Sequence, residues 1–285
     1  MLNALTVDVE EYFHAHAYEK AIAPADWGRL PSRVEDNVRR LLELFAEVGA
    51  RATFFVLGWV AERHPGLVRE IAGLGHELAT HGYAHRLVYR QTRAEFAHDL
   101  ERSLAAIRNS TGTDAVVGYR APSFSITGDV LWALEVLREQ GLRYDSSILP
   151  IASSGLLKAG KRQGLAGASR FATRLAPGLW EFPVSTVRLA NRNWPVAGGG
   201  YLRLLPLWLT RRAIGRINDE GQPAVVYLHP WEIDRDEPPV PGVERLARFR
   251  HRVNVHRTES RLRALLTERP FGPMRDVFAP QLGAA

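Results

Sequence analysis

Short apolar runs alternate with longer amphipathic segments along most of the chain, and this alternation restricts its fold more than any other feature. The run Ala-Thr-Phe-Phe-Val-Leu-Gly at 52–58 is almost continuously apolar and rich in aromatic and β-branched residues. Such a run is typical of a strand buried on both faces of a parallel sheet. Apolar residues at helical spacing precede it at 34–48 and follow it at 64–74. This order predicts an α/β fold with parallel strands.

The same reading extends along the chain. We predict further strands at 5–9, 77–79, 115–119, 142–145, 180–184 and 224–228, and further helices at 92–110, 129–140, 205–219 and 259–266. Ser32 is expected to cap the first helix. Residues 151–170 are rich in Ser, Gly, Ala and Lys, so we expect a mobile loop, a lid or a disordered insertion there. No repeat or linker divides the chain, and we expect one domain over 1–285, with its core at 6–231 and a C-terminal extension at 240–285.

Composition excludes several kinds of site and partner. The chain has no cysteine, which excludes disulfides and thiolate metal sites. No run approaches the roughly 18 apolar residues of a membrane span, and the first residues lack the basic and apolar regions of a signal peptide; we therefore expect a cytoplasmic protein. The formal net charge is +6, but the arginines are spread along the chain. We interpret them mainly as a solvated surface and expect no nucleic-acid partner.

The first predicted strand ends in carboxylates. Apolar and polar residues alternate over 5–9, and this alternation places Asp8 and Glu10 on the same side of the strand. Such acids can belong to an ordinary solvated strand end. Alternatively, one acid binds a metal while the other moves a proton, and this interpretation requires histidines elsewhere in the chain.

Two histidines follow another predicted strand. His81 and His85 are four residues apart, and on a helical turn this spacing places both imidazoles on one face. Two histidines and one carboxylate form a common catalytic metal site with a position open for water. The spacing alone is more often structural, but α/β barrels assemble active sites where their strands end. For His14 and His16 we expect surface or hydrogen-bonded positions rather than metal binding.

Three more polar residues lie at the ends of predicted strands in the same way. They are Arg120 in Tyr-Arg-Ala-Pro, Asp145 at the end of the strand at 142–145, and His229 in Tyr-Leu-His-Pro. Each has an ordinary structural alternative: a surface cation, a turn cap or a packed histidine. Five such positions in order along the chain favour a shared active site.

In this order the motifs resemble those of the polysaccharide deacetylases of carbohydrate esterase family 4, the nodulation-type deacetylases, across residues 6–231. Asp-Val-Glu-Glu-Tyr-Phe, Gly-Gly-Gly-Tyr-Leu-Arg and Arg-Thr-Glu-Ser-Arg-Leu resemble more narrowly the exopolysaccharide-locus subgroup associated with exosortase systems. The resemblance implies a distorted (β/α) barrel, often with seven strands. It also implies one divalent metal ion, usually zinc, with cobalt, nickel and manganese as alternatives.

The resemblance assigns a role to each motif residue. Asp8 matches the catalytic base, and Arg120 matches the arginine that holds it. His229 matches the catalytic acid, and Asp145 matches the aspartate that orients and tunes that acid. The residues that match the metal ligands are Glu10, His81 and His85.

The sequence departs from the common family pattern in two places. A valine separates Asp8 from Glu10, whereas the commoner motif has two adjacent aspartates. We assign Glu10 as the ligand because Glu11 should face the other side of the strand. Ser123 stands where an aromatic residue often follows Arg-x-Pro, with Phe124 one place later. The aromatic residues that could bind sugar rings are Phe124, Trp194, Tyr201 and Trp231.

These roles imply a hydrolase that removes N-acetyl groups from amino sugars of a polysaccharide, or of its lipid-linked precursor, during exopolysaccharide synthesis. A precursor at the inner membrane face would suit a cytoplasmic enzyme at the membrane surface and its surplus of arginine. Two alternatives stay open: a hydrolase of cyclic amides, imides or ureides on the same fold, and a non-catalytic carbohydrate-binding protein with a degenerate site. We make no prediction of the oligomeric state.

Overall fold

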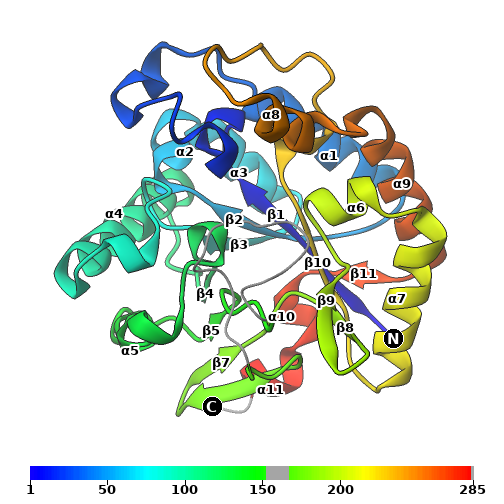
Figure 1. Ribbon diagram of the computed structural model, residues 1–285. Helices are drawn as coiled ribbons and strands as arrows, with labels where there is room; N and C mark the ends of the chain where they lie inside the picture. The colour runs from blue at the N-terminus through cyan, green and yellow to red at the C-terminus, as the bar shows by residue number, and fades with distance from the viewer. Residues whose placement is uncertain (152–166, 284–285) are drawn as a thin grey trace.

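The computed structural model describes residues 1–151 and 167–283, and its centre is a curled nine-stranded sheet (Figure 1). Its parallel part follows the order β10-β1-β2-β3-β4-β5-β7. The bounds are β1 Asn3–Val9, β2 Thr53–Val56, β3 Glu77–Thr80, β4 Gly118–Tyr119, β5 Tyr144–Asp145, β7 Leu179–Glu181 and β10 Val225–Leu228. The predicted seven-stranded α/β architecture is confirmed in this part. The sheet is an open half-barrel, because its path ends at β6 (Thr173–Ala176), which pairs antiparallel with β7.

β1 lies inside the sheet and joins both ends of the chain. All seven of its residues are buried, although apolar and polar residues alternate along its end, so its polar side chains are covered as well as its apolar ones. It pairs in parallel with β2 and β10. The short strand β11 (Phe271–Gly272) also pairs with β1, so the C-terminal extension contributes to the same sheet as the core.

Helices cover the sheet, and hydrophobic side chains between the two layers form the core. The α-helices are α1 Val34–Glu47, α2 Gly58–Arg63, α3 Pro65–Gly73, α4 Arg93–Thr111, α5 Trp132–Glu139, α6 Gly200–Leu204, α7 Leu207–Asp219, α8 Arg245–Arg252, α9 Val255–Glu268, α10 Met274–Val277 and α11 Ala279–Gly283. The 3-10 helices are η1 Tyr12–His14, η2 His16–Tyr18, η3 Pro24–Arg29, η4 Val88–Arg90, η5 Pro122–Phe124, η6 Gly128–Val130 and η7 Pro230–Ile233. No helix in the described part of the chain is long and apolar enough to cross a membrane.

The first helix begins differently from its prediction. The expectation that Ser32 caps α1 is wrong, because the helix begins at Val34 and Arg33 occupies the N-cap position. The backbone N–H of Arg33 donates to Glu11 Oε2 at 2.9 Å, and the Ser32 hydroxyl donates to the same carboxylate. A side chain from the end of β1 therefore satisfies the start of the helix.

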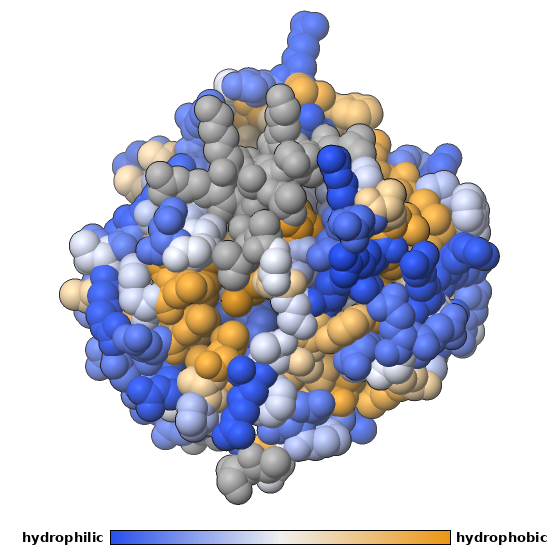
Figure 2. All heavy atoms as spheres, turned by 60° about the horizontal axis from the view of Figure 1, so that its bottom comes forward, coloured by the Kyte–Doolittle hydropathy of each residue, from blue (hydrophilic) through white to orange (hydrophobic). Residues whose placement is uncertain are grey.

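Several elements of the structure were not predicted from the sequence. Strands β8 (Thr186–Leu189) and β9 (Arg192–Pro195) form a separate antiparallel hairpin, and α8 precedes the predicted last helix. The loop or lid expected at 151–170 falls mostly outside the described residues. Figure 2 shows the lower end of Figure 1, where hydrophobic side chains are exposed in patches among hydrophilic ones.

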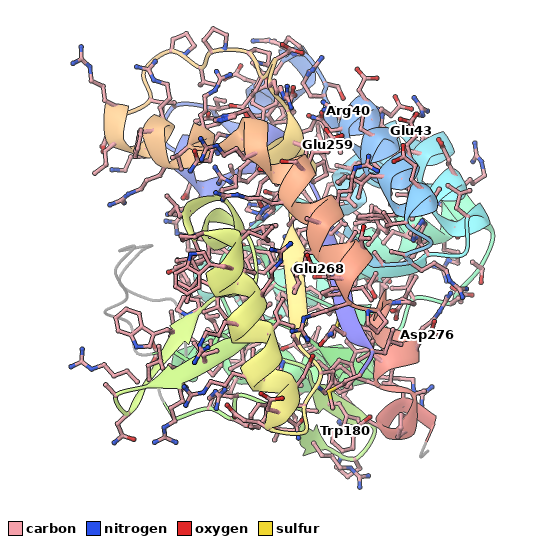
Figure 3. The ribbon with its side chains drawn as sticks, turned by 90° about the vertical axis from the view of Figure 1, so that its right-hand side faces the viewer. Arg40, Glu43, Trp180, Glu259, Glu268 and Asp276 are labelled. Atoms are coloured by element: carbon pink, nitrogen blue, oxygen red, sulfur yellow. The ribbon has the colours of Figure 1, made fainter. Side chains whose placement is uncertain are left out.

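Helices α1 and α9 pack on the same short helix and are joined by an ion pair. Arg40 of α1 and Glu259 of α9 face each other in the side view of Figure 3, with Nη2 and Oε2 2.9 Å apart. Both helices also contact η7, the short helix after β10. This packing fixes the segment after β10 between two longer helices, at the end of the sheet where the candidate site lies.

Candidate active site

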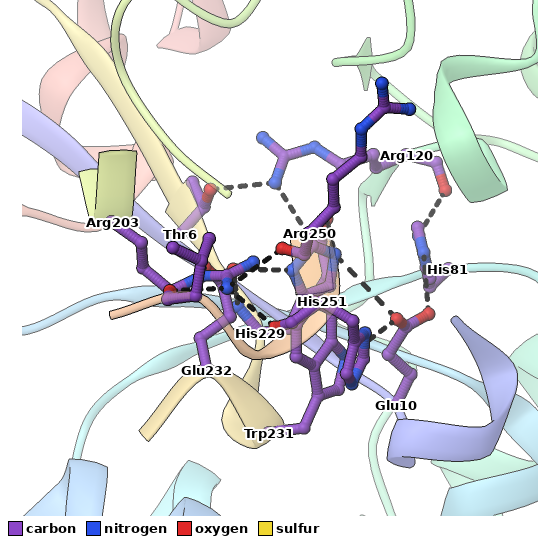
Figure 4. A network of polar contacts seen from close by, with 12 residues as sticks. Thr6, Glu10, His81, Arg120, Arg203, His229, Trp231, Glu232, Arg250 and His251 are labelled. Atoms are coloured by element: carbon purple, nitrogen blue, oxygen red, sulfur yellow. Dashed lines mark hydrogen bonds and ion pairs between the residues drawn. The ribbon is translucent and has the colours of Figure 1, made fainter. Parts of the chain in front are cut away.

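The polar residues that follow the strands converge at the carboxyl end of the parallel sheet (Figure 4). Asp8 lies in β1, Glu10 follows it, His81 follows β3, Arg120 follows β4 and His229 follows β10. Neighbouring parallel strands end at the same edge, so residues far apart in sequence meet there. The convergence predicted from the sequence is therefore present in the structure.

Glu10, His81 and His85 bring together three side chains of types that can bind a metal ion. Glu10 Oε2 lies 2.8 Å from Nε2 of His85 and 4.0 Å from Nε2 of His81. The three ligand atoms lie within 4.8 Å of one another. Burial alone would raise the pKa of Glu10, but His85, His229 and His81 lower it well below its usual value. An ionised carboxylate and two convergent imidazoles suit a divalent ion with nitrogen and oxygen ligands.

His81 is oriented by a backbone carbonyl. Its Nδ1–H donates to the carbonyl oxygen of Arg120 at 2.8 Å, so Nε2 presents its lone pair toward Glu10. Burial lowers the pKa of His81 to about 4, which keeps the ring neutral at neutral pH. A neutral imidazole with a fixed tautomer is the form that binds a metal.

The two metal-site histidines do not lie on a helical turn, so that part of the prediction is wrong. Residues 81–85 form no helix, and Gly82 and His85 have φ of +75° and +51°. These left-handed conformations interrupt a helix. Asp99 holds the turn instead, because its Oδ2 accepts the backbone N–H of Tyr83 at 2.7 Å. The rings meet because the chain doubles back, with centroids 5.6 Å apart.

The structure distinguishes Glu10 from Glu11 as the sequence predicted. Glu10 faces the histidines, whereas Glu11 faces the first turn of α1 and accepts hydrogen bonds there. Burial raises the pKa of Glu11, although Ser32 and the backbone of α1 oppose the rise. The prediction for the two early histidines also holds. His14 accepts a hydrogen bond from the backbone of Glu11, and His16 pairs with Glu19 at 2.9 Å.

Asp8 is held by a fully buried arginine. Arg120 has no solvent-exposed surface, and its Nη1 donates to Asp8 Oδ1 at 2.7 Å and to Thr6 Oγ1 at 2.8 Å. Nη2 donates to Ser146 Oγ at 3.0 Å. These bonds fix the Asp8 carboxylate and leave its Oδ2 3.9 Å from His229 Nε2. The proposed base is thus oriented into the site by the arginine that the resemblance assigned to it.

His229 is held by a carboxylate and an arginine that the sequence analysis did not assign. Its Nδ1–H donates to Glu232 Oε1 at 2.8 Å, and Glu232 Oε2 accepts from Arg203 Nε at 2.8 Å. Burial alone would lower the pKa of His229, but the bond to Glu232 and nearby Glu10 and Asp8 raise it to about 9. His229 is therefore a protonated imidazolium at neutral pH, with Nε2 directed toward the other carboxylates.

Glu232, rather than Asp145, contacts His229. Asp145 accepts a hydrogen bond from Ser147 and lies opposite Glu181 in the β5–β7 ladder. Burial raises the pKa of Asp145 above its usual value. Glu232, which lies on the same segment as His229, therefore occupies the orienting position that the resemblance assigned to Asp145. The sequence contains a signal for the role of Glu232, because this residue stands three positions after His229. Its Oε1 accepts the backbone N–H of His229 at 3.1 Å and so closes a capping box at the start of η7.

The predicted sugar-binding aromatics fall into two groups. Trp231 stacks on His229 with centroids 4.7 Å apart and donates from Nε1 to Glu10 Oε1 at 3.2 Å. Phe124 is buried beside Tyr227, 5.1 Å away. Trp194 and Tyr201 instead line a cavity of about 1170 Å³ between the β8–β9 hairpin, α6 and α7. Trp231 therefore contacts the proposed metal ligands directly, whereas Phe124 lies beside Arg120 and Tyr227.

Two family models match the chain in succession. Residues 26–144 match the polysaccharide deacetylase model, and residues 146–279 match a domain of unknown function, DUF3473. His81, His85 and Arg120 lie in the first match. His229, Glu232 and Arg203 lie in the second.

Curated relatives and solved structures agree with the first match. A peptidoglycan deacetylase of Helicobacter pylori is 31% identical over 127 residues, 45% of this chain and 42% of that protein. A chitooligosaccharide deacetylase of Sinorhizobium fredii is 33% identical over 91 residues, 32% of this chain and 42% of that protein. The chain thus spans less than half of these relatives.

The fold comparison covers almost the whole chain. A crystal structure from Mycobacterium smegmatis, assigned to the polysaccharide deacetylases, superposes with a TM-score of 0.62 at 23% identity, covering 98% of this chain and 90% of that one. A peptidoglycan N-acetylglucosamine deacetylase superposes with a TM-score of 0.50 at 15% identity, covering 97% and 87%. Residues 26–144 thus match the polysaccharide deacetylase family in sequence, and the chain shares the fold of solved structures assigned to that family.

Proposed function

We propose that this protein is a metal-dependent hydrolase that removes N-acetyl groups from amino-sugar residues of a polysaccharide or its precursor. The observation that carries the proposal is that a metal-binding trio, a fixed carboxylate and a protonated imidazole share one buried site. His229 Nε2 lies 3.8 Å from Glu10 Oε1 and 3.9 Å from Asp8 Oδ2. Hydrolysis of an amide needs an electrophile, a base and an acid, and each has a candidate within this distance.

The ligand set fits a divalent ion, and zinc first among them. Glu10, His81 and His85 would hold this ion. The chain has no cysteine, so no thiolate ligand would favour a softer metal such as Cu(I). Such an ion would supply Lewis acidity toward the carbonyl group of the acetamide. Trp231 would support the carboxylate ligand, because its indole N–H already bonds Glu10.

The residues of the chain perform the proton transfers. Asp8 accepts a proton from the attacking water through Oδ2, since Oδ1 is occupied by Arg120. His229 donates a proton from Nε2 to the departing amine, because Nδ1 is committed to Glu232. Without this donation the amine would leave as a poor anion and the tetrahedral adduct would revert. Acid–base assistance of this kind contributes roughly 10²–10⁴-fold.

The named relatives support a sugar polymer as the substrate. They are described as deacetylases of peptidoglycan and of chitooligosaccharides. We take the more specific role, deacetylation of an exopolysaccharide or of its lipid-linked precursor at the cytoplasmic membrane surface, from the three subgroup-like segments. The match at 146–279 to DUF3473 is compatible with this assignment.

The test is acetate release by zinc-loaded protein freed of excess metal. We expect about one equivalent of zinc per chain and acetate from N-acetylated chitooligosaccharides. Ureides and imides run in parallel test the cyclic-amide alternative. His81→Ala should lose both metal and turnover, whereas the matched control His16→Ala, an exposed histidine paired with Glu19, should lose neither. A His81→Ala protein with full metal content and turnover would overturn the proposal, as would turnover of ureides without any release of acetate.

A further inference from the structure

Helix α8 exposes two large apolar side chains on one face. Its sequence is Arg-Leu-Ala-Arg-Phe-Arg-His-Arg, and Leu246 and Phe249 are 57% and 62% exposed. Residues three apart on a helix lie side by side. A single exposed apolar residue is ordinary, but a pair on one helical turn forms a contiguous patch that favours a contact outside the chain.

The opposite face of α8 is fixed to the active site. His251 is buried, its Nε2 lies 2.8 Å from Glu237 Oε2, and its ring stacks on Trp231 at 4.1 Å. Arg203 Nη1 donates to the carbonyl oxygen of His251 at 2.6 Å (Figure 4). These contacts fix the orientation of α8 about its own axis, with the face that carries His251 turned inward. Leu246 and Phe249 therefore point outward because α8 is anchored, and not because it is loosely packed.

The exposed apolar pair is flanked by arginines. At about 100° per residue, Arg245 lies on one side of the pair and Arg250 on the other. Both are exposed, as is Arg248. Within the described residues, these three guanidinium groups have no carboxylate within ion-pair distance, whereas Arg39 and Arg93 each have two. The nearest acidic side chain in sequence, Glu244, pairs instead with Lys20 at 3.9 Å.

We propose that α8 docks this protein onto a bilayer that contains anionic phospholipids. Leu246 and Phe249 insert at the level of the headgroups, and the flanking arginines contact lipid phosphates. An apolar face bordered by arginines is the pattern of helices that lie in a membrane interface. A second copy of the chain fits less well, because a symmetric contact through this face would bring the same unpaired arginines together.

The docking would orient the active site. α8 lies on the side of the molecule toward which β1 points (Figure 1), and Trp231 connects its His251 to His229. The end of the sheet that carries the metal-binding trio would thus face the bilayer, where a lipid-linked saccharide would be presented. Docking does not depend on the proposed deacetylation, and it is tested by binding alone.

The first experiment measures co-sedimentation with vesicles. The full-length protein should bind phosphatidylcholine vesicles that contain phosphatidylglycerol and should bind phosphatidylcholine alone at least about tenfold more weakly. Leu246→Ser with Phe249→Ser should reduce binding to the anionic vesicles by about tenfold or more. The matched control replaces Leu74 and Leu131, which are 53% and 43% exposed, with serine and should bind like the unaltered protein.

The second experiment changes charge. Arg245→Gln with Arg250→Gln should weaken binding to anionic vesicles by about tenfold or more. Arg51→Gln with Arg138→Gln removes the same charge from other exposed positions and should change the binding by less than about twofold. Thermal unfolding and acetate release from a soluble oligosaccharide show that each variant is folded. Equal loss in both charge variants, or no effect of either α8 variant, would overturn the proposal. So would binding to a soluble anionic polysaccharide without binding to vesicles.

Discussion

Two histidines beside the same carboxylate differ in their protonation. His81 Nε2 and His229 Nε2 lie 4.0 Å and 3.8 Å from the oxygens of Glu10, and both are largely buried. Burial lowers the pKa of His81 to about 4, whereas the pKa of His229 is raised to about 9 despite burial. The shared neighbour therefore does not determine the charge of either ring.

The difference lies at the other ring nitrogen. Nδ1 of His81 faces the uncharged carbonyl oxygen of Arg120, and burial then favours the neutral ring. Nδ1 of His229 faces Glu232, whose pKa burial would raise but Arg203 and His229 lower to about 2. An ionised partner offsets the cost of burying a cation. Two imidazoles in one site can thus serve as a metal ligand and as a proton donor.

The largest expected effect comes from removing each histidine in turn. His81→Ala should lose the metal and reduce turnover by about 10³-fold or more. His229→Ala should keep the metal and reduce turnover by roughly 10²–10⁴-fold through loss of the acid. Metal analysis and acetate release on the same samples distinguish the loss of the metal from the loss of the acid. Equal metal loss in both variants would mean that the two histidines do not have separate roles.

A second prediction concerns the buried ion pair behind His229. Arg203 and Glu232 are 3% and 0% exposed in their side chains. Arg203→Met removes one of the two cationic partners of the buried Glu232 carboxylate and should destabilise the fold by about 3–5 kcal/mol. Denaturant unfolding measures the loss. The matched variant Arg211→Met removes a half-buried arginine that pairs with the exposed Glu268 and should cost less than about 1 kcal/mol. Similar losses in the two variants would contradict a structural role for the inner pair.

Replacing Glu232 should move the pH dependence of turnover. In the unaltered protein, activity should fall as pH rises through about 9, when His229 loses its proton. Glu232→Gln removes the negative partner, so this fall should begin at lower pH and turnover at neutral pH should drop by about 10-fold to 100-fold. Asp145→Asn is the matched control, and it should leave the alkaline limb unchanged. An alkaline limb that moves with Asp145→Asn and not with Glu232→Gln would restore the role first assigned to Asp145.

The same shift makes stability depend on pH. The folded-state pKa of His229 lies above the value of 6.5 for an unperturbed histidine. Its stabilising contribution should therefore be complete below about pH 6.5 and should disappear as pH rises through about 9. The difference in unfolding free energy between the unaltered protein and Glu232→Gln should narrow over this interval. A constant difference from pH 6 to 10 would be inconsistent with a raised pKa.

The smallest effect separates the two adjacent acids. Glu11→Gln weakens the cap of α1, because Arg33 N–H then donates to a neutral group, and it should cost about 1 kcal/mol of stability. Metal content should remain unchanged. Glu10→Gln should instead lose metal binding. Loss of metal in Glu11→Gln at full folding would show that the ligand had been assigned to the wrong acid.

The sequence predicted elements whose local pattern matches their tertiary environment. The run at 52–58 becomes β2 because both faces of that strand are covered. The helix predicted at 92–110 is α4, and at its start the Thr92 N–H donates to Glu95 Oε2 at 2.8 Å. The positions of Asp8 and Glu10 followed from the period of two in β1. These features depend on residues close in sequence.

Other features depend on contacts that no short segment specifies. The β8–β9 hairpin turns through Ala190 and Asn191, which both have positive φ, without the Asn-Gly pair that usually marks such a turn. α8 has few apolar residues and is held by distant partners such as Trp231. The partner of His229 was missed because its assignment followed family resemblance. The His-x-x-Glu spacing of the segment itself gave the better signal.

The most direct test of the division between the two kinds of histidine is imidazole NMR of the zinc-loaded protein with ¹⁵N-labelled histidine. At pH 7.5, we predict that His229 carries protons on both ring nitrogens and that His81 carries one, on Nδ1, with each signal assigned through its alanine variant. In the metal-free protein, the His229 signal should titrate near pH 9. A neutral His229 at pH 7.5, or zinc bound through His229 instead of His81, would contradict the account.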